Sequence, residues 1–410
     1  MIRVKTSGSR QYHLRRKAWN AAMTNELVEN ELYLEHTAKK LKLAIVSFPM
    51  RPGFADYMVG LCKGLSSHFE LQLYISHSYE ASYEQYFRAS TFAFGRTRHL
   101  PLDYPRFVLA VLKNKPDICL FQAWIKLPLL DAMIIRFLRT LGYRCFVTVH
   151  DAAPHEQKWW HSVTIPIFFK SFDGGICHSN KAIDVLRKLG VRTPLTKIPH
   201  GLLDHYQKSS IDKEQISLPP IADDPRVFVI LFFGHVTRRK GIIHLVAALK
   251  LIGSDHPVKL IVAGKFALSQ MDLSVIERMA DERAILINRL ISFAEVRPLF
   301  DLSHCVVLPY LEGTTSGVLK LAMAFSKPIV STPIGDVEEV LSSNQYIAIP
   351  EYKGSDAEFE AGIASAILAA KERHIEMKQH MEALRADYSW ENAGSAYANF
   401  LASPRRKRSK

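Results

Sequence analysis

Short runs of consecutive apolar residues, each closed by a turn signal, recur along the chain from Leu41 onwards. Such runs are typical of strands buried on both faces of a parallel sheet. Stretches between them repeat apolar residues at helical spacing, for example at 58–69, 242–252 and 316–325. The alternation predicts an α/β fold with parallel sheets. The predicted strands lie in LKLAIVSFP (41–49), DICLFQAW (117–124), RCFVTVHD (144–151), GGICHS (174–179), RVFVILFFG (226–234), VKLIVAGK (258–265), HCVVLPY (304–310) and KPIVST (327–332).

These strands are too many for one open sheet, and a polar seam divides them. The segment 204–225 contains two consecutive prolines and few apolar residues, as an interdomain linker does. Two doubly wound domains joined there would face each other across a cleft at the carboxyl ends of their strands. The predicted parts are a polar tail or peripheral helix (1–40), a first domain (41–205), a linker (206–225) and a second domain (226–386).

Composition narrows the choice of partners. The 53 Lys and Arg exceed the 40 Asp and Glu, so the formal net charge is +13. A basic protein attracts polyanions, but no zinc-knuckle spacing, aromatic RNA-binding signature or basic helix with heptads appears, so we expect no nucleic-acid partner. Anionic lipid headgroups explain the charge equally well. The segment KWWHSVTIPIFFK (158–170) fits either a membrane interface or a buried helix with external charges.

The apolar runs and the cysteines indicate where the protein works. No apolar run approaches the roughly 18 residues that span a bilayer, and the basic N-terminal residues are not followed by the apolar core of a secretory signal. The five cysteines are widely spaced without a C-x-x-C, as buried thiols in a reducing compartment are. We therefore expect a cytoplasmic protein, either free or peripheral on the inner face of the plasma membrane.

Five motifs, in their order and spacing, carry a family resemblance. VTVHD (147–151), ICHSNKAIDVLRKLG (176–190) and KIPHG (197–201) lie in the first half, and FFGHVTRRKGIIHLVAAL (232–249) and LPYLEGTTSGVLKLAMAFSKPIVSTPIGDVEEVL (308–341) in the second. The chain resembles retaining GT-B glycosyltransferases of the family 4 type, of the kind that builds bacterial surface polysaccharide. The resemblance runs from about Leu41 to Leu401. It implies that a C-terminal helix (387–402) crosses back to the first domain, ahead of a basic tail (403–410).

The second domain carries the predicted donor site. The loop from Gly234 to Gly241 joins a strand to a helix, so its N–H groups would face the cleft, where Lys240 could neutralise a diphosphate. Small residues at 313–317 open another helix, whose N-terminal end also favours an anion. The predicted donor-binding residues are Gly234, His235, Arg238, Arg239, Lys240, Glu312, Gly313, Thr314, Thr315, Ser316, Gly317 and Lys320.

Two positions depart from the family's pattern. His235 stands where the family often has Arg, which puts one phosphate contact in doubt. Leu321 stands where relatives have the second Glu, which holds the nucleotide ribose, while Lys320 lies at the family's spacing from Glu312. We expect donor binding to depend on the loop amides, on Lys240 and on Lys320.

The first domain carries the predicted catalytic and acceptor residues. His150 follows a buried strand, and the resemblance implies that it approaches the transferred sugar, with Asp151 orienting it or capping the next turn. Gly53 and Arg51 resemble the loop that shapes the acceptor site. No fourth ligand accompanies His150, Asp151 and His155, and no D-x-D occurs, so we expect no metal and no cofactor beyond the nucleotide-sugar co-substrate.

These features predict a metal-independent hexosyltransferase. It would move a sugar from a nucleotide-diphosphate donor to a hydroxyl of an acceptor such as a lipid-linked saccharide, and the resemblance implies retention of anomeric configuration. The alternatives are a catalytically reduced scaffold or binding subunit of a polysaccharide assembly complex, which Leu321 and His235 keep open, and a nucleotide-sugar epimerase, which would convert the donor without an acceptor.

Overall fold

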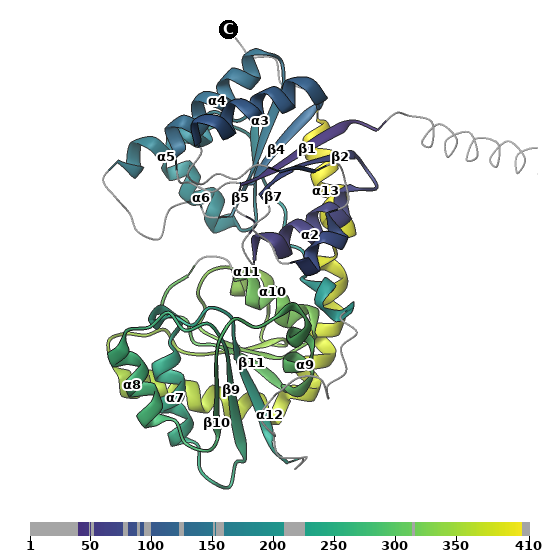
Figure 1. Cartoon of the computed structure of the whole chain (residues 1–410). Helices are drawn as coiled ribbons and strands as arrows, with labels where there is room; N and C mark the ends of the chain where they lie inside the picture. Colours follow the sequence, from purple (N-terminus) through teal and green to yellow (C-terminus); the bar gives the residue numbers. More distant parts are fainter. Residues whose placement is uncertain are drawn as a thin grey trace, which may run out of the picture. The chain divides into compact units, whose positions relative to one another are not determined.

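The computed structural model contains two parallel sheets with helices packed on them (Figure 1). Neighbouring strands in both sheets pair in parallel, as the apolar runs predict. The residues that the structure describes are 40–48, 50, 53–76, 81–87, 91–93, 100–122, 127–150, 152, 160–208, 226–313 and 316–403.

The first sheet has seven strands in the order β3-β2-β1-β4-β5-β6-β7. Its centre is apolar: the strand made by KLAIVS has only one residue that is not fully buried. The strands are β1 (Lys42–Ser47), β2 (Glu70–Ile75), β3 (Thr91–Ala93), β4 (Ile118–Gln122), β5 (Arg144–Val149), β6 (Gly174–Cys177) and β7 (Leu195–Lys197). The helices of this domain are α2 (Phe54–Leu65), α3 (Leu100–Asn114), α4 (Pro128–Thr140), α5 (His161–Phe169) and α6 (Asn180–Lys188), with the 3-10 helices η1 (Ala81–Tyr86) and η2 (Asp204–Lys208).

The second sheet has six strands in the order β10-β9-β8-β11-β12-β13. Its strands are β8 (Phe228–Phe233), β9 (Val258–Gly264), β10 (Ala284–Asn288), β11 (Cys305–Leu308), β12 (Ile329–Ser331) and β13 (Tyr346–Ala348). Its helices are α7 (Ile242–Leu251), α8 (Gln270–Met279), α9 (Phe293–Leu302), α10 (Gly317–Ala324), α11 (Val337–Val340) and α12 (Asp356–Leu384), with the 3-10 helices η4 (Arg238–Lys240) and η5 (Arg385–Tyr388).

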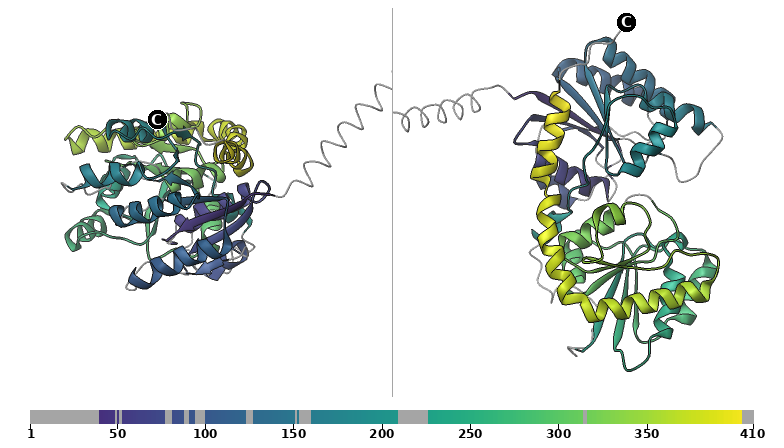
Figure 2. Two further views of the ribbon diagram at one scale, coloured as in Figure 1. Left: turned by 90° about the horizontal axis from the view of Figure 1, so that it is seen from above. Right: turned by 180° about the vertical axis from the view of Figure 1, so that it is seen from behind.

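The last helix, α13 (Trp390–Ala402), returns to the first domain, which confirms the predicted crossover (Figure 2). It packs on α2 backbone to backbone: a Cβ atom on Gly64 would overlap the carbonyl of Trp390, and one on Gly394 would overlap the carbonyl of Gly64. The Trp390 indole donates to the Leu202 carbonyl (2.6 Å), and the hydroxyls of Tyr57 and Tyr397 are 2.6 Å apart. Glycines at the contact therefore allow the close approach that this crossing requires.

All eight predicted strands are present, and the fold is the predicted pair of doubly wound domains. Of the predicted linker, residues 209–225 lie outside the described residues, as do most of the predicted N-terminal tail and the C-terminal basic tail. None of the helices that the structure describes is both long and apolar enough to cross a bilayer.

Candidate functional site

A tight turn at the carboxyl end of β8 brings the main chain of the second domain close to three neighbouring segments. Gly234 has a φ of +94° and donates its N–H to the Ala263 carbonyl (2.9 Å). A Cβ on Gly264 would overlap the Gly234 carbonyl, and a Cβ on Gly241, whose φ is +72°, would overlap the Pro309 carbonyl. Only glycine fits these positions, and the turn holds η4 at the carboxyl edge of the sheet.

Lys240, at the end of η4, is a partly buried cation. Its ammonium nitrogen lies 5.5 Å from the centre of the Tyr310 ring, and among the described residues no carboxylate pairs with it. Burial, together with the nearby Arg239, lowers the pKa of Lys240 to about 8. Since desolvation penalises the charged form, a bound anion would favour it again. The side chain is therefore suited to hold a phosphate.

The N-terminal end of α10 lies beside the same turn. The Ser316 hydroxyl caps the helix by accepting the N–H of Leu319 (3.3 Å). A Cβ on Gly234 would lie 3.2 Å from Cγ2 of Val318 and 3.8 Å from Nζ of Lys240. The lysine, the turn and the first turn of α10 thus converge, and both the cation and the helix terminus favour an anion.

The remaining predicted residues of this region differ in their surroundings. Arg238 is mostly exposed and pairs with the buried carboxylate of Asp272 (3.0 Å), so its charge is already partnered. The Arg239 carbonyl accepts the N–H of Leu311 (2.8 Å). Partial desolvation of the His235 imidazole, and then the cations of Lys240, Lys265 and Arg239, lower its pKa. Glu312 is exposed, Gly313 is half-buried, Gly317 borders open space, and Thr314 and Thr315 lie outside the described residues.

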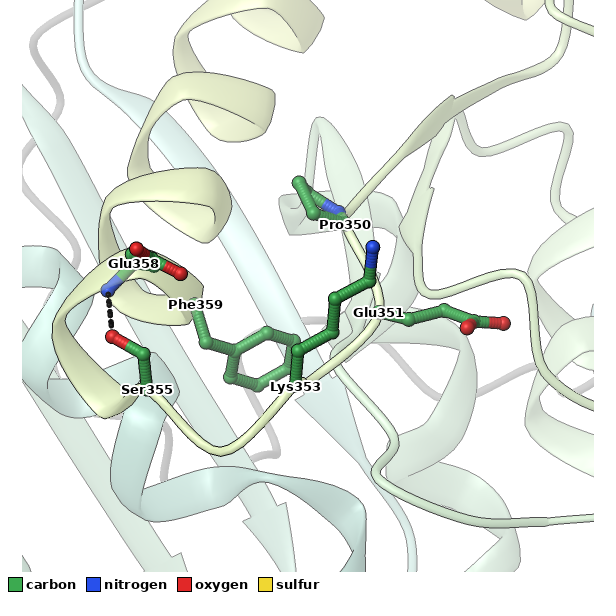
Figure 3. Close-up of a pocket in the computed structure, with 6 residues that line it drawn as sticks. All are labelled: Pro350, Glu351, Lys353, Ser355, Glu358 and Phe359. Carbon is green, nitrogen blue, oxygen red and sulfur yellow. Dashed lines mark hydrogen bonds between the residues drawn. The ribbon is translucent and has the colours of Figure 1, made fainter.

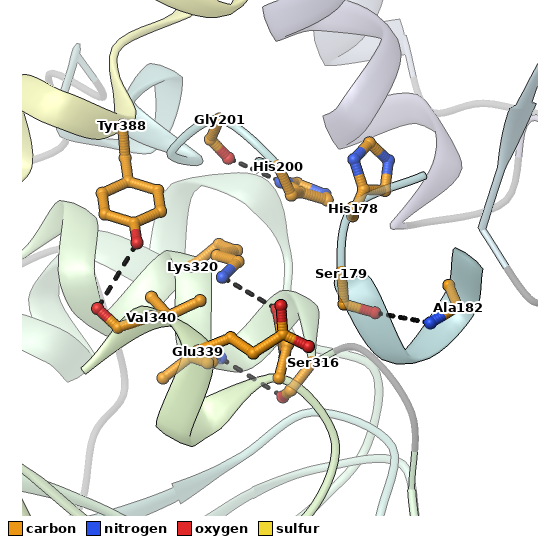
Figure 4. Close-up of polar contacts among 12 residues, drawn as sticks. His178, Ser179, Ala182, His200, Gly201, Ser316, Lys320, Glu339, Val340 and Tyr388 are labelled. Carbon is orange, nitrogen blue, oxygen red and sulfur yellow. Dashed lines mark hydrogen bonds and ion pairs between the residues drawn. The ribbon is translucent and has the colours of Figure 1, made fainter. Parts of the chain in front are cut away.

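Lys320 has a different environment from Lys240, although both are predicted donor contacts. Its side chain is only 1% exposed, and its ammonium forms an ion pair of 3.0 Å with Asp336, which is 2% exposed (Figure 4). The Tyr388 ring centre lies 5.5 Å from the ammonium. This partnered burial favours a structural role for Lys320 over a donor contact. Leu321 is 3% exposed and belongs to the apolar core of the second domain.

Neutral side chains occupy the carboxyl ends of the first sheet's strands. His150, just after β5, places Nε2 2.9 Å from Oε1 of Gln122 at the end of β4. Because that oxygen only accepts, Nε2 carries the proton and Nδ1 remains an acceptor. Burial, and then the neighbouring His178, lower the pKa of His150 well below its ordinary value. The imidazole is therefore neutral near pH 7.

Three histidine rings lie around the ring of Tyr57 in α2. The centres of the His150, His178 and His200 rings lie 4.6, 5.3 and 4.8 Å from that of Tyr57. His178 donates from Nδ1 to the Ile198 carbonyl (2.9 Å), which leaves Nε2 an acceptor, buried and without a partner among the described residues. Burial lowers the pKa of His178 to about 4 and that of His200 well below 6.5. These rings therefore offer neutral acceptors rather than charge.

The other predicted first-domain residues are only partly described. Gly53 caps α2 with a φ of +90°, and its N–H donates to Asp56 (3.0 Å). The next residue, Phe54, places its ring 5.0 Å from that of His150. Arg51 and Asp151 lie outside the described residues. Within the described part of the chain no group of three or more ligating side chains could hold a metal ion.

The two domains meet through Glu339 of α11. Its carboxylate accepts the N–H groups of Asn180 (2.9 Å) and Lys181 (3.3 Å) at the start of α6, and pairs with Lys197 (2.9 Å). These contacts outweigh the effect of burial, so the pKa of Glu339 is lowered. Neither Glu339 nor Gln122 is a sequence-predicted site residue. Gln122 has a faint signal, since it is polar at the end of an apolar run.

A cavity of about 370 Å³ lies elsewhere in the second domain, between the end of β13 and the start of α12 (Figure 3). Ser355 caps α12 there by accepting the N–H of Glu358 (3.4 Å). Two carboxylates stand beside one lysine, so the cavity lacks the excess positive charge of the Lys240 turn. Its lining residues are Pro350, Glu351, Lys353, Ser355, Glu358 and Phe359.

Two doubly wound domains with a C-terminal helix that crosses back define the GT-B fold, which this chain has. Solved structures share it over nearly the whole chain. That of Anabaena Alr3699/HepE in complex with UDP-glucose has a TM-score of 0.68 at 15% identity and covers 89% of this chain and 100% of its own. That of sucrose-phosphate synthase from Thermosynechococcus elongatus has a TM-score of 0.66 at 15% identity and covers 88% and 98%.

A family model matches the second domain. Residues 227–368 match the model of the glycosyl transferases group 1 family. A GDP-mannose:glycolipid 4-beta-D-mannosyltransferase of Xanthomonas campestris pv. campestris is 26% identical over 204 residues, which are 49% of this chain and 53% of the relative. The chain thus spans about half the length of this mannosyltransferase relative.

Proposed function

We propose that the protein is a glycosyltransferase that moves a sugar from a nucleotide-diphosphate donor to an acceptor hydroxyl. The observation that carries the proposal is the convergence of Lys240, the Gly234 turn and the N-terminal end of α10 in the second domain, which matches the group 1 family model. Cleavage of the sugar–phosphate bond develops negative charge on the leaving diphosphate. A partly desolvated ammonium and a helix terminus that are already in place stabilise that charge.

The chemistry of the sugar belongs to the first domain. Nδ1 of His150 and Nε2 of His178 are neutral acceptors that fit sugar hydroxyls. The relatives' names add support for the donor class, since one solved neighbour binds UDP-glucose and the Xanthomonas relative is named for GDP-mannose. A glycolipid acceptor in that relative's name supports a lipid-linked saccharide acceptor for this chain, as part of the proposal. No step needs a metal ion.

We further propose retention of anomeric configuration, which the family resemblance supports. The β-linkage in the name of the Xanthomonas relative argues for inversion instead, so the configuration of the product has a test of its own. In a retaining reaction of this type the departing phosphate takes the acceptor's proton on the same face, so no second carboxylate is required. NMR spectroscopy of the anomeric proton in the product tests this point directly. An α-linked product from an α-linked donor supports retention, and a β-linked product overturns it.

The test of the function uses the purified full chain with UDP-glucose and GDP-mannose. Thermal unfolding with each nucleoside diphosphate measures the donor site, since a ligand at 100 times its Kd stabilises by about 2.7 kcal/mol. Incubation with extracted membrane lipids then measures transfer to an acceptor. Stabilisation and a glycosylated lipid support the proposal. Stabilisation by neither nucleotide overturns it in favour of a scaffold, and epimerisation of the donor without acceptor overturns it in favour of an epimerase.

A further inference from the structure

Large apolar side chains gather on the solvent side of three consecutive helices of the first domain. Of the 15 exposed large hydrophobic residues in the described part of the chain, nine lie on α3, α4, α5 or the residues that cap them. The second domain has five, which lie on separate elements. We call the first group the α3–α5 face. Its members are Leu102, Leu109, Leu129, Leu130, Met133, Phe137, Leu141, Trp160 and Val163.

The helix α4 shows the pattern most clearly. Its inner side is buried through Ala132, Ile135 and Leu138. Its outer side presents Met133, 68% exposed, and Phe137, 47% exposed, at a spacing of four residues, with further leucines one turn before and after. Apolar side chains on two sides of a helix are normally covered on both. The five on the outer side of α4 and its cap are instead 37% to 68% exposed.

The helix α4 packs against α5 and contacts α3, so the three helices adjoin one another (Figure 1). Tyr104 of α3 donates to Asp131 of α4 (2.6 Å), and Arg139 of α4 donates to the Ser171 carbonyl just after α5 (2.8 Å). Exposed apolar side chains that gather on adjoining helices, rather than lying scattered, mark an interaction surface.

The charges on this face have one sign. Among the described residues of α3, α4 and α5 with their caps, the exposed charged side chains are all basic, while the two carboxylates, Asp103 and Asp131, are buried. The start of α5 adds Trp160, a residue type that prefers the bilayer interface. The exposed basic residues are Arg106, Lys113, Lys115, Arg136 and Lys170.

We propose that the α3–α5 face docks on the surface of a bilayer that contains anionic phospholipid. Apolar side chains would enter the headgroup region while the basic ones pair with lipid phosphates. A bilayer fits better than a protein partner because an apolar surface that extends over three helices and carries only positive charges complements a sheet of anionic headgroups. The helix α4 begins after β4, whose last residue, Gln122, contacts His150. The docked face would thus bring lipid-linked acceptors near the first domain's strand ends; this consequence rests on the proposed function, whereas docking itself does not.

The experiment measures binding of the full chain to phosphatidylcholine vesicles with and without phosphatidylglycerol, by co-sedimentation and without any sugar. We expect binding to the anionic vesicles that weakens with salt. The double variant Met133→Glu/Phe137→Glu should bind at least about tenfold more weakly. The matched control Leu251→Glu/Met271→Glu changes equally exposed apolar residues of the second domain and should bind like the parent.

A dye-labelled cysteine tests whether the α3–α5 face is the part of the protein that contacts the bilayer. All five native cysteines are buried, so Met133→Cys offers one accessible thiol for an environment-sensitive dye. A blue shift of that dye on anionic vesicles, with none at Met271→Cys, supports the proposal. Equal binding of the Met133/Phe137 variant and the parent overturns it, as does an unshifted dye on bound protein. A parent dimer that becomes monomeric in the double variant, measured by light scattering, also overturns it in favour of a second copy as the occupant.

Discussion

The carboxyl ends of the two sheets present opposite kinds of surface. In the second domain the turn after β8 exposes cations, and Lys240 lacks a carboxylate partner among the described residues. In the first domain the strand ends present His150, His178 and His200, all with pKa values below the ordinary value. The two sheets therefore provide two different environments. In the second domain, desolvation lowers the pKa of Lys240 but leaves the side chain charged near pH 7, whereas in the first domain desolvation keeps the imidazoles neutral.

Under the proposed function, this difference divides the sugar transfer between the two domains. A diphosphate needs a positive partner whose charge is not already neutralised, and hydroxyl groups need neutral donors and acceptors. The ion pair between Lys320 and Asp336 shows the contrast within the second domain, because its cation is fully buried and already partnered. Lys240 and Lys320 thus differ in function because a carboxylate neutralises Lys320, whereas no described carboxylate pairs with Lys240.

Loss of the Lys240 charge should have the largest effect on activity. Lys240→Met removes the cation from the turn but keeps most of the apolar stem. We expect kcat/KM to fall by about 10²- to 10³-fold, because charge on the leaving diphosphate loses a preorganised partner. Lys259→Met, on β9 and away from the turn, is the control. A near-parental rate in the Lys240 variant, with an unchanged unfolding temperature, would remove the residue from the site.

The Lys240 turn could be predicted from the sequence because its residues lie close together along the chain. The glycines at 234 and 241 and the lysine between them lie within eight residues, so their order alone indicates a strand-to-helix turn. The eight predicted strands could also be recognised from the sequence, since each is an apolar run. The strands that the sequence does not reveal are interrupted or short: β2 contains Glu70 and Gln72, β10 is half-exposed along its length, and β3, β7 and β13 have three residues each.

Contacts between distant segments could not be predicted. Gln122 and His150 are 28 residues apart, and Glu339 and Asn180 are 159 apart, so no local spacing records either pair. The same holds for Lys320: its spacing from Glu312 suggests a ligand contact, and only the tertiary structure shows Asp336 beside it. A pattern in the sequence fixes which element a side chain occupies, but its partner depends on packing.

Donor binding should depend on pH through the titration of Lys240. The pKa of Lys240 is about 8 without ligand, and a bound diphosphate should raise it. Above pH 8 binding must therefore take up a proton, so affinity for the nucleoside diphosphate should fall by up to about tenfold per pH unit until the pKa of the bound form is reached. Isothermal titration calorimetry in buffers of different ionisation enthalpy measures the proton uptake.

Lys240→Arg is the matched control for this dependence. A guanidinium stays protonated throughout the range, so the fall in affinity above pH 8 should disappear. Persistence of the same dependence in the arginine variant would mean that another group titrates. On the neutral side of the comparison, the lowered pKa of His150 predicts no titration of its own between pH 6.5 and 8.

Removal of the His150 acceptor should have a smaller effect than removal of the Lys240 cation. His150→Phe keeps an aromatic ring against Tyr57 but loses the nitrogen that would accept a sugar hydroxyl. A neutral hydrogen bond contributes about 1 kcal/mol, so we expect kcat/KM to fall by roughly five- to tenfold with nucleoside diphosphate affinity unchanged. His256→Phe, at an exposed position of the second domain, is the control. A loss of diphosphate affinity in the His150 variant would contradict the division between the domains.

The smallest expected effect concerns the junction at which the two environments meet. Glu339 receives two N–H groups at the start of α6 and the ammonium of Lys197, so its negative charge complements both a helix N-terminal end and a cation. Glu339→Gln keeps the shape but removes the charge. The pair is partly exposed, so we expect the free energy of unfolding to fall by about 1 kcal/mol or less.

Differential scanning calorimetry should show the unfolding temperature of the Glu339 variant lowered by about 2 °C at neutral pH. The difference should shrink as the pH falls below 4.5, the ordinary pKa, and vanish once the pH is below the lowered pKa of Glu339 in the folded protein, where the carboxylate is protonated. Glu338→Gln alters the exposed neighbour and should leave the temperature unchanged. Equal unfolding temperatures of the two variants would show that the contact through Glu339 does not hold the domains together in solution.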